Sequence, residues 1–170
     1  MKYGRYFLHL AAFLLALTIL VLPLPAQAQS AATVYADYEN EDLSGQDKSG
    51  KDFSDNVFIN VNLQSANLSN AKFIGADITK VNFTNANLHG ADFTSAFINV
   101  CNFKGADLTD ALFEYAFISK SKFNGADITG ADFEVAIFDS NEDRELCKNA
   151  SGTNTITGVD TRDSLFCYPN

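Results

Sequence analysis

Large apolar residues recur at every fifth position over residues 53–138, eighteen times without a change of register. A step of five residues turns about 140° around an α-helix, and it alternates between the two faces of a β-strand. Neither element would bring all eighteen residues to one side. The pattern instead predicts a chain that turns a corner in every repeat and keeps its apolar centres inside. These centres are Phe53, Phe58, Leu63, Leu68, Phe73, Ile78, Phe83, Leu88, Phe93, Ile98, Phe103, Leu108, Phe113, Ile118, Phe123, Ile128, Phe133 and Phe138.

A second inward column is predicted two positions before each centre. Alanine occupies this position in twelve of the eighteen repeats, and mostly Asp, Asn or Lys stands between it and the centre. The two inward columns should therefore flank a column that points outward. Turn-forming Ser, Thr, Asn and Gly follow the centres and suit tight corners. The alanines are Ala66, Ala71, Ala76, Ala86, Ala91, Ala96, Ala106, Ala111, Ala116, Ala126, Ala131 and Ala136.

A longer period of twenty residues predicts how the corners close into coils. Among the small inward positions, exceptions to alanine recur at this interval as Val61, Val81, Cys101 and Ser121. Four repeats therefore make one coil, and like residues stack on like. Phenylalanine then dominates two opposite sides of a square interior, and aliphatic residues dominate the other two. At a strand spacing of ~4.8 Å per coil, the eighteen repeats would rise by roughly 22 Å.

Ala-Asn-Leu at 66–68 and Ala-Asp-Phe at 91–93 resemble the pentapeptide-repeat family, whose consensus reads Ala-(Asp/Asn)-(Leu/Phe)-x-x. The resemblance covers about residues 41–140. It implies an all-β solenoid, namely a right-handed quadrilateral β-helix whose repeats form four faces. It implies no single function, because fold and function separate easily.

The chain is expected to divide into four segments. Before Phe53 the repeat is degenerate, since Lys48 stands where an apolar centre belongs. Both ends of the stack should be covered, because a coil at the end of a solenoid exposes unpaired strand edges. The segments are a signal peptide at 1–28, an N-terminal cap at 29–42, the repeats at 43–140 and a C-terminal cap at 141–170.

The first 28 residues have the pattern of an export signal. Lys2 and Arg5 precede an apolar run over 7–22, and the small-x-small sequence Ala-Gln-Ala follows at 26–28. This pattern predicts a secretory signal peptide that is cleaved after Ala28, with no stable membrane insertion afterwards. The alternative is an uncleaved membrane anchor, for which the run is short. No Ser- and Arg-rich transit sequence comes first, which favours direct bacterial export over organelle import.

The charge of the processed chain argues against one class of partner. Loss of Lys2 and Arg5 takes the formal net charge from −9 to −11. An acidic chain without a basic patch is not expected to bind nucleic acid.

Three cysteines agree with an exported protein. Cys147 and Cys167 lie outside the repeats and are expected to form one structural disulfide in an oxidising compartment. A redox-active pair is the alternative, although the Cys-x-x-Cys spacing is absent. Cys101 falls in an inward column and is expected to be a buried, unpaired thiol. Two short helices, over 141–149 and 162–167, are predicted to form the C-terminal cap, with Ser140 and Thr161 as their N-caps.

This exported arrangement with two cysteines resembles periplasmic or lumenal pentapeptide-repeat proteins of cyanobacteria, with relatives in chloroplast thylakoid lumens. The resemblance implies a location in the thylakoid lumen or the periplasm, and it defines no biochemical role.

The sequence offers little that could support catalysis. His89 is the one histidine after the leader, and it stands at an outward turn position. The recurring threonines occupy a turn position too. The sequence has no Gly-rich phosphate loop and no paired metal ligands outside the repeat pattern. We therefore expect no enzyme activity, no cofactor and no metal.

One outward column departs from the polar pattern. On the other faces, the outward position before each centre is polar apart from one leucine. The apolar residues of this column therefore predict either a partner surface or a surface that the tail covers through Leu146, Leu165 and Phe166. Self-association would use the same surface. The column holds Val57, Asp77, Phe97, Phe117 and Ile137, with Tyr115, Val100 and Val135 at nearby corners.

Three functions are compatible with these features. The leading hypothesis is an exported, non-enzymatic scaffold that binds an unknown protein partner. The second is an inhibitor or protector of topoisomerases that mimics nucleic acid, as some pentapeptide-repeat proteins do, although an export signal separates the chain from cytoplasmic DNA enzymes. The third is a redox-responsive lumenal regulator that uses the Cys147–Cys167 pair.

Overall fold

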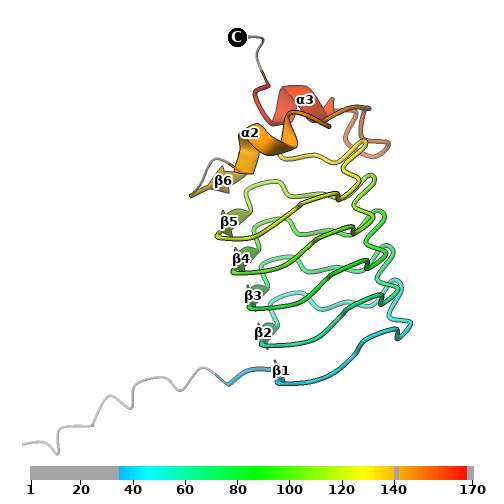
Figure 1. Cartoon of the computed structure of the whole chain (residues 1–170), viewed down its shortest axis with the longest axis vertical. Coiled ribbons are helices and arrows are strands. Elements are labelled where there is room, and N and C mark those ends of the chain that lie inside the picture. The colour runs from blue at the N-terminus through cyan, green and yellow to red at the C-terminus, as the bar shows by residue number, and fades with distance from the viewer. Residues whose placement is uncertain (1–34, 140–141, 168–170) are drawn as a thin grey trace, which may run out of the picture. The chain divides into compact units, whose positions relative to one another are not determined.

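A computed structural model describes residues 35–139, which wind into a parallel β-solenoid, and residues 142–167, which cap it (Figure 1). The expected signal peptide, the beginning of the expected N-terminal cap and the expected N-cap Ser140 lie outside the described residues.

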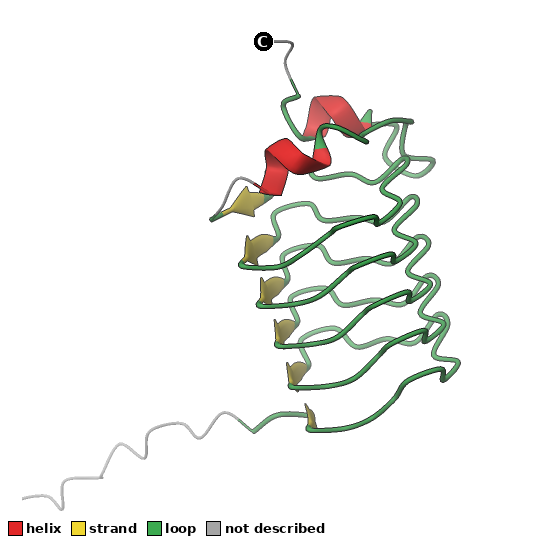
Figure 2. Ribbon diagram, viewed as in Figure 1, coloured by secondary structure: helices red, strands yellow, loops and turns green. Residues whose placement is uncertain are grey.

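One face of the solenoid is a six-stranded parallel sheet with the order β1-β2-β3-β4-β5-β6 (Figure 2). Each strand pairs with the strand twenty residues further on, so that Phe58 lies beside Ile78 and Ile98 beside Ile118. Parallel bridges with the same step join the other faces, for example between Asn62 and Asn82. The predicted period of four repeats per coil is confirmed. The strands are β1 (Tyr38–Glu39), β2 (Val57–Ile59), β3 (Asp77–Thr79), β4 (Phe97–Asn99), β5 (Phe117–Ser119) and β6 (Ile137–Phe138).

The coils begin earlier along the chain than the regular repeats do. Tyr38 occupies a centre position, pairs with Phe58 and stacks on it with ring centroids 4.6 Å apart. It belongs to the stretch that the sequence assigned to the N-terminal cap. Lys48 keeps the coil register through a hydrogen bond from its N–H to the Asn67 carbonyl, and its side chain is half-buried. A lysine is tolerated there because the end of the stack lets its ammonium reach water.

Two interlocking ladders of phenylalanine fill the interior. Seventeen of the eighteen predicted centres are buried, and Phe138 is half-buried. Within a ladder the rings stack nearly parallel, as Phe73 does on Phe93 with centroids 4.9 Å apart. Between ladders the rings meet edge to face, as Phe83 does with Phe93 at 6.2 Å. Both arrangements are favourable for aromatic quadrupoles.

The outward Asp and Asn side chains close the turns that follow them. Asp47 Oδ1 accepts the Ser49 N–H at 3.0 Å, and Asn67 Oδ1 accepts the Ser69 N–H one coil above. Asn67 Nδ2 also donates to Asp47 Oδ1, so the amides form a ladder between coils. This local bond is the reason why Asp or Asn recurs at this position.

Acid is expected to destabilise the first coil. The Ser49 backbone N–H lowers the pKa of Asp47 below its ordinary value. A carboxyl whose pKa is lower in the folded state stabilises the fold above its unfolded pKa of about 3.9, and this contribution is lost as the pH falls through the folded pKa. Urea unfolding at about pH 5 and at lower pH should reveal the loss. Asp47→Asn should remove part of this dependence, and an unchanged profile would contradict the assignment.

Each corner places one residue in the left-handed backbone region. Gly75 suits this conformation, but Val100, Tyr115 and Val135 also adopt it with φ of +58°. A left-handed conformation costs a side-chain-bearing residue about 1–2 kcal/mol, and β-branched residues tolerate it least. The two valines are therefore strained.

Val100→Asn is expected to raise the free energy of unfolding by about 1 kcal/mol, because Asn tolerates the left-handed region better than Val does. Chemical denaturation followed by circular dichroism measures the change. Asn60 occupies the same corner two coils below with φ of +56°. Asn60→Val is the reversed control and should lower stability, and equal stability of both variants with the wild type would exclude the strain.

A cap of two short helices, α2 (Glu142–Leu146) and α3 (Thr161–Ser164), covers the last coil (Figure 1). Its side chains pair with backbone groups that a further coil would otherwise bind. Ser164 Oγ accepts the Phe133 N–H at 3.0 Å, Glu142 accepts the Phe123 N–H, and Asn154 Nδ2 donates to the Gly130 carbonyl at 2.8 Å. The cap thus satisfies the strand edges at this end.

The expected N-cap of α3 was wrong by one residue. Asp160, not Thr161, is the N-cap, and its side chain accepts the Arg162 N–H. Thr161 is already helical and buried. The shift follows from Asp160 adopting the extended backbone that an N-cap requires.

Candidate functional site

An apolar stripe, defined as Phe97, Phe117 and Ile137, runs up the outside of the strand face. Strand register places these residues directly above one another in β4, β5 and β6. Phe97 is 59% exposed, Phe117 38% and Ile137 58%. The rings of Phe97 and Phe117 lie 6.3 Å apart. The stripe is therefore continuous over three coils and open to solvent.

The stripe ends below and widens at the corners. Val57, which the sequence placed in the same column, is half-buried, and the exposed Asp77 separates it from Phe97. Tyr115, Val135 and Val100 are exposed large apolar residues at the corners beside the stripe. The structure thus brings four of the five predicted surface residues together and leaves Val57 apart.

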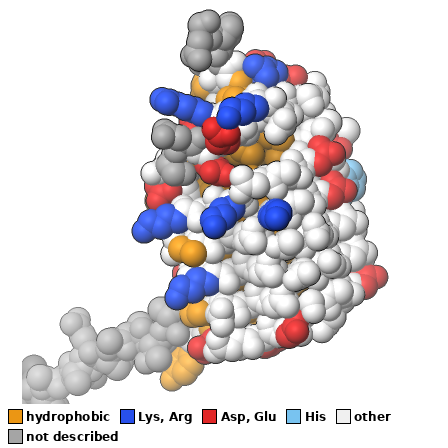
Figure 3. Space-filling model, in the orientation of Figure 1, with side chains coloured by type: hydrophobic (Ala, Val, Ile, Leu, Met, Phe, Trp, Pro, Cys, Tyr) orange, Lys and Arg blue, Asp and Glu red, His pale blue; other side chains and the backbone are white. Residues whose placement is uncertain are grey.

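Opposite charges flank the stripe. The corners that follow β3 and β5 carry Lys80 and Lys120, the basic edge, with Val100 between them in the column. The corners that precede β2, β5 and β6 carry the acidic edge, composed of Asp55, Glu114 and Glu134. Within residues 35–139 and 142–167, none of these side chains forms an ion pair. Lysine and arginine side chains gather beside the strands and over the cap in Figure 3.

The C-terminal tail packs on the end of the stack. Leu146 and Leu165 are buried and belong to the hydrophobic core cluster, whereas the stripe keeps its exposure. The hypothesis that these leucines cover the stripe was therefore wrong. The unpaired strand edge of the last coil attracts the tail, because its backbone groups need partners.

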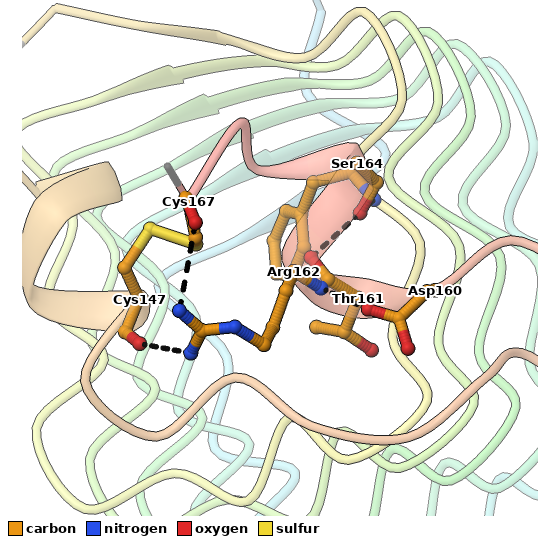
Figure 4. The surroundings of a disulfide bond; sticks show 7 residues. Cys147, Asp160, Thr161, Arg162, Ser164 and Cys167 are labelled. Atoms are coloured by element: carbon orange, nitrogen blue, oxygen red, sulfur yellow. Dashed lines mark hydrogen bonds between the residues drawn. A yellow bond between two sulfur atoms is a disulfide. The ribbon is translucent and has the colours of Figure 1, made fainter. Parts of the chain in front are cut away.

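A disulfide between Cys147 and Cys167 ties the two cap helices together (Figure 4). The predicted pairing is confirmed, with the Cα atoms 5.5 Å apart. Arg162 spans the bridge, since its guanidinium donates to the Cys147 carbonyl at 3.1 Å and to the Cys167 carbonyl at 3.5 Å. Both cysteines are half-buried.

Cys101 is a free thiol inside the stack, as expected. Burial raises its pKa to about 12, and Sγ donates to the Ile78 carbonyl at 3.3 Å. Thiolate is the reactive form, so Cys101 is expected to resist alkylation by iodoacetamide in the native protein and to react only after unfolding. Mass spectrometry of the alkylated protein measures this. Modification of the folded chain at the rate of a free cysteine would contradict the burial.

The described residues contain no obvious centre for chemistry. His89 is exposed, and its Nδ1 lies 2.8 Å from Thr109 Oγ1 one coil above. Residues 35–139 and 142–167 contain no group of three or more His, Cys, Asp or Glu side chains that could hold a metal ion. In the same part of the chain, no helix is both long and apolar enough to span a bilayer.

Residues 50–133 match the family model of the pentapeptide repeat region. The chain is also 38% identical to a pentapeptide-repeat protein from the thylakoid lumen of Arabidopsis thaliana, with a TM-score of 0.56; the match covers 76% of this chain and 90% of that one. The chain belongs to the pentapeptide-repeat family. No curated protein matches it.

Two further pentapeptide-repeat structures share the fold alone. Rfr23 from the cyanobacterium Cyanothece 51142 is 22% identical over 58% of this chain and 64% of its own, with a TM-score of 0.51. QnrB1, a plasmid-mediated fluoroquinolone resistance protein, is 20% identical over 58% of this chain and 55% of its own, with a TM-score of 0.50. The family resemblance inferred from the repeats is confirmed.

The two charged edges and the polar side chains that cap the stack were not predicted from the sequence. The edges were detectable, because Lys80 and Lys120 share one corner column and Glu114 and Glu134 share the column of the preceding corner when the repeats are aligned every twenty residues. Ser164 and Asn154 carried no such signal, since they lie outside the repeats.

Proposed function

We propose that this pentapeptide-repeat protein is a non-enzymatic interaction scaffold whose apolar stripe is its binding surface. The observation that carries the proposal is the exposure of Phe97, Phe117 and Ile137, whereas the equivalent outward positions on the other faces are polar apart from Leu112. Exposed contiguous apolar surface on a soluble protein marks interaction sites. The rigid stack holds the stripe in place, so little ordering entropy opposes binding.

We further propose that the scaffold works after export, in the thylakoid lumen or the periplasm. The leader at 1–28 and the cysteine pair support export. The 38% identical relative from a thylakoid lumen supports it as well.

Affinity capture with the protein purified from the fraction where it accumulates tests the proposal. Phe97→Asp with Phe117→Asp should abolish stripe-dependent capture from soluble and membrane fractions while the circular dichroism and thermal midpoint stay close to wild type. Ile156 is 68% exposed in the cap, so Ile156→Asp is the matched control and should capture normally. If the stripe variant folds and still captures the same proteins, the stripe is not the binding surface.

A redox-responsive role is the second candidate, because the Cys147–Cys167 disulfide holds the cap. Its reduction potential decides between the two roles. A value below about −300 mV, which resists the glutathione pool, indicates a structural bridge, and a higher value indicates a regulatory one. Mimicry of nucleic acid is disfavoured, because the export signal at 1–28 separates the chain from cytoplasmic DNA enzymes.

A further inference from the structure

We infer that the apolar stripe binds a second copy of this chain, in a parallel face-to-face dimer whose two-fold axis runs along the solenoid. The inference rests on the proposed function, because it needs the stripe to be a binding surface.

The distribution of charge around the stripe is self-complementary. The basic edge lies on one side of the strand face and the acidic edge on the other. A two-fold axis parallel to the solenoid exchanges the two sides without changing the height. Each basic edge then meets the acidic edge of the other copy. A two-fold axis perpendicular to the solenoid would bring lysine against lysine, which is unfavourable.

The heights of the charges also match at the levels of β3 and β5. Lys120 and Glu114 lie at opposite ends of β5 in the same coil. In the dimer, Lys120 of each copy would therefore face Glu114 of the other copy. Lys80 and Gly75 lie at opposite ends of β3. Asp55 belongs to the coil below, but its Oδ1 lies 2.7 Å from where a Cβ would stand at Gly75. Its carboxylate therefore reaches the height at which the partner's lysine would lie.

Two further carboxylates, those of Asp139 and Asp77, lie near the proposed interface. Asp139 follows the strand face on the basic side, where it accepts the Ser119 hydroxyl at 2.6 Å and the Lys120 N–H at 3.0 Å, and its charge offsets part of that of Lys120. Asp77 stands below Phe97 and would face its own copy. Lys80 follows Asp77 by three residues. The two Asp77 carboxylates would therefore lie between the two Lys80 ammonium groups at this solvated rim of the interface.

The apolar area is sufficient for a weak dimer. A whole aromatic side chain offers ~150–250 Å². At the exposed fractions of the stripe and of Tyr115, Val100 and Val135, on the order of 500 Å² of apolar surface is open per copy, and about 1,000 Å² in a pair. Specific interfaces begin at about this size, with affinities that are often modest. The strained backbone at Val100 and Val135 fits the same purpose, since strain persists where it serves a functional surface.

Analytical ultracentrifugation of the purified protein from about 1 µM to 1 mM tests the dimer, because interfaces of this size are often micromolar. The mass is expected to double within this range, and Phe117→Asp should abolish the doubling. Ile156→Asp, away from the stripe, should leave it unchanged.

A charge exchange tests the parallel arrangement. Lys120→Glu and Glu114→Lys should each weaken dimerisation about tenfold or more, because each places like charges together twice per dimer. Both substitutions in one chain should restore the wild-type affinity. An antiparallel dimer predicts that neither single substitution weakens binding, and this result would overturn the proposed arrangement.

Other outcomes would overturn the dimer and show separately whether the stripe is a binding surface. A wild-type protein that stays monomeric over the whole range overturns the dimer, and the occupant of the stripe must then be sought elsewhere. Binding of that monomer to vesicles containing phosphatidylglycerol would identify a lipid surface, and stripe-dependent capture of a different protein would identify a heterologous partner. If none of these depends on the stripe, the proposed function fails together with the dimer.

Discussion

Phe93→Ala is expected to lower the free energy of unfolding by about 3–5 kcal/mol, the usual cost of removing a buried aromatic ring. Phe93 is fully buried. It stacks on Phe73 and Phe113 with centroids 4.9 Å away in both directions, and its edges meet Phe83 at 6.2 Å and Phe103 at 6.0 Å. Hydrogen bonds between coils hold these neighbours in register, so they cannot collapse into the space that the ring leaves.

Equilibrium unfolding in urea, followed by circular dichroism, measures the effect. Phe97→Ala is the matched control, since Phe97 belongs to the next repeat and is 59% exposed. It should change stability by less than about 1 kcal/mol. Similar losses for the two variants would show that the inward and outward columns are not as described. A broader transition in Phe93→Ala would show that the lesion uncouples neighbouring coils, which interact only with adjacent ones.

Removal of the disulfide by Cys147→Ser with Cys167→Ser is expected to destabilise the cap by about 3 kcal/mol, the chain-entropy value for a loop of this length. The cysteines are twenty residues apart. The loss should be local, because the cap bonds to the end of the stack, for example through the Ser164 and Asn154 hydrogen bonds. The coils of β2 to β5 keep their own backbone bonds and aromatic ladders.

Hydrogen exchange detected by mass spectrometry separates the two regions. Amides of 142–167 should exchange much faster in the double variant, while those of the inner coils stay protected. Cys101→Ala is the control, since it removes a thiol and leaves the bridge intact. Uniformly faster exchange along the chain would instead mean that the cap and the stack unfold as one unit.

The two candidate functional features differ in how their loss should appear. Changes in the stripe should alter binding at constant stability, because its side chains touch solvent. Changes in the cap should alter local stability first, because its side chains satisfy the backbone of the last coil. A variant that separates these effects identifies which feature a physiological partner uses.

The amino-acid sequence by itself determined the solenoid. The periods of five and twenty residues assign every centre from Phe53 to Phe138, and the structure places each of these in the predicted column. The prediction succeeds because every repeat advances the backbone by the same step, so that residues at the same position of each coil point in the same direction. The stripe residues Phe97, Phe117 and Ile137 were predictable for the same reason.

Only the tertiary structure decided what lies at the ends and what stays open. Tyr38 extends the coils because its ring stacks on Phe58, and Asp160 replaces Thr161 as the N-cap because the chain is extended there. The tail lies on the last coil and not on the stripe, since the Phe133 N–H needs the acceptor that Ser164 supplies. These contacts join residues with no common period, and a spacing rule has no means of finding them.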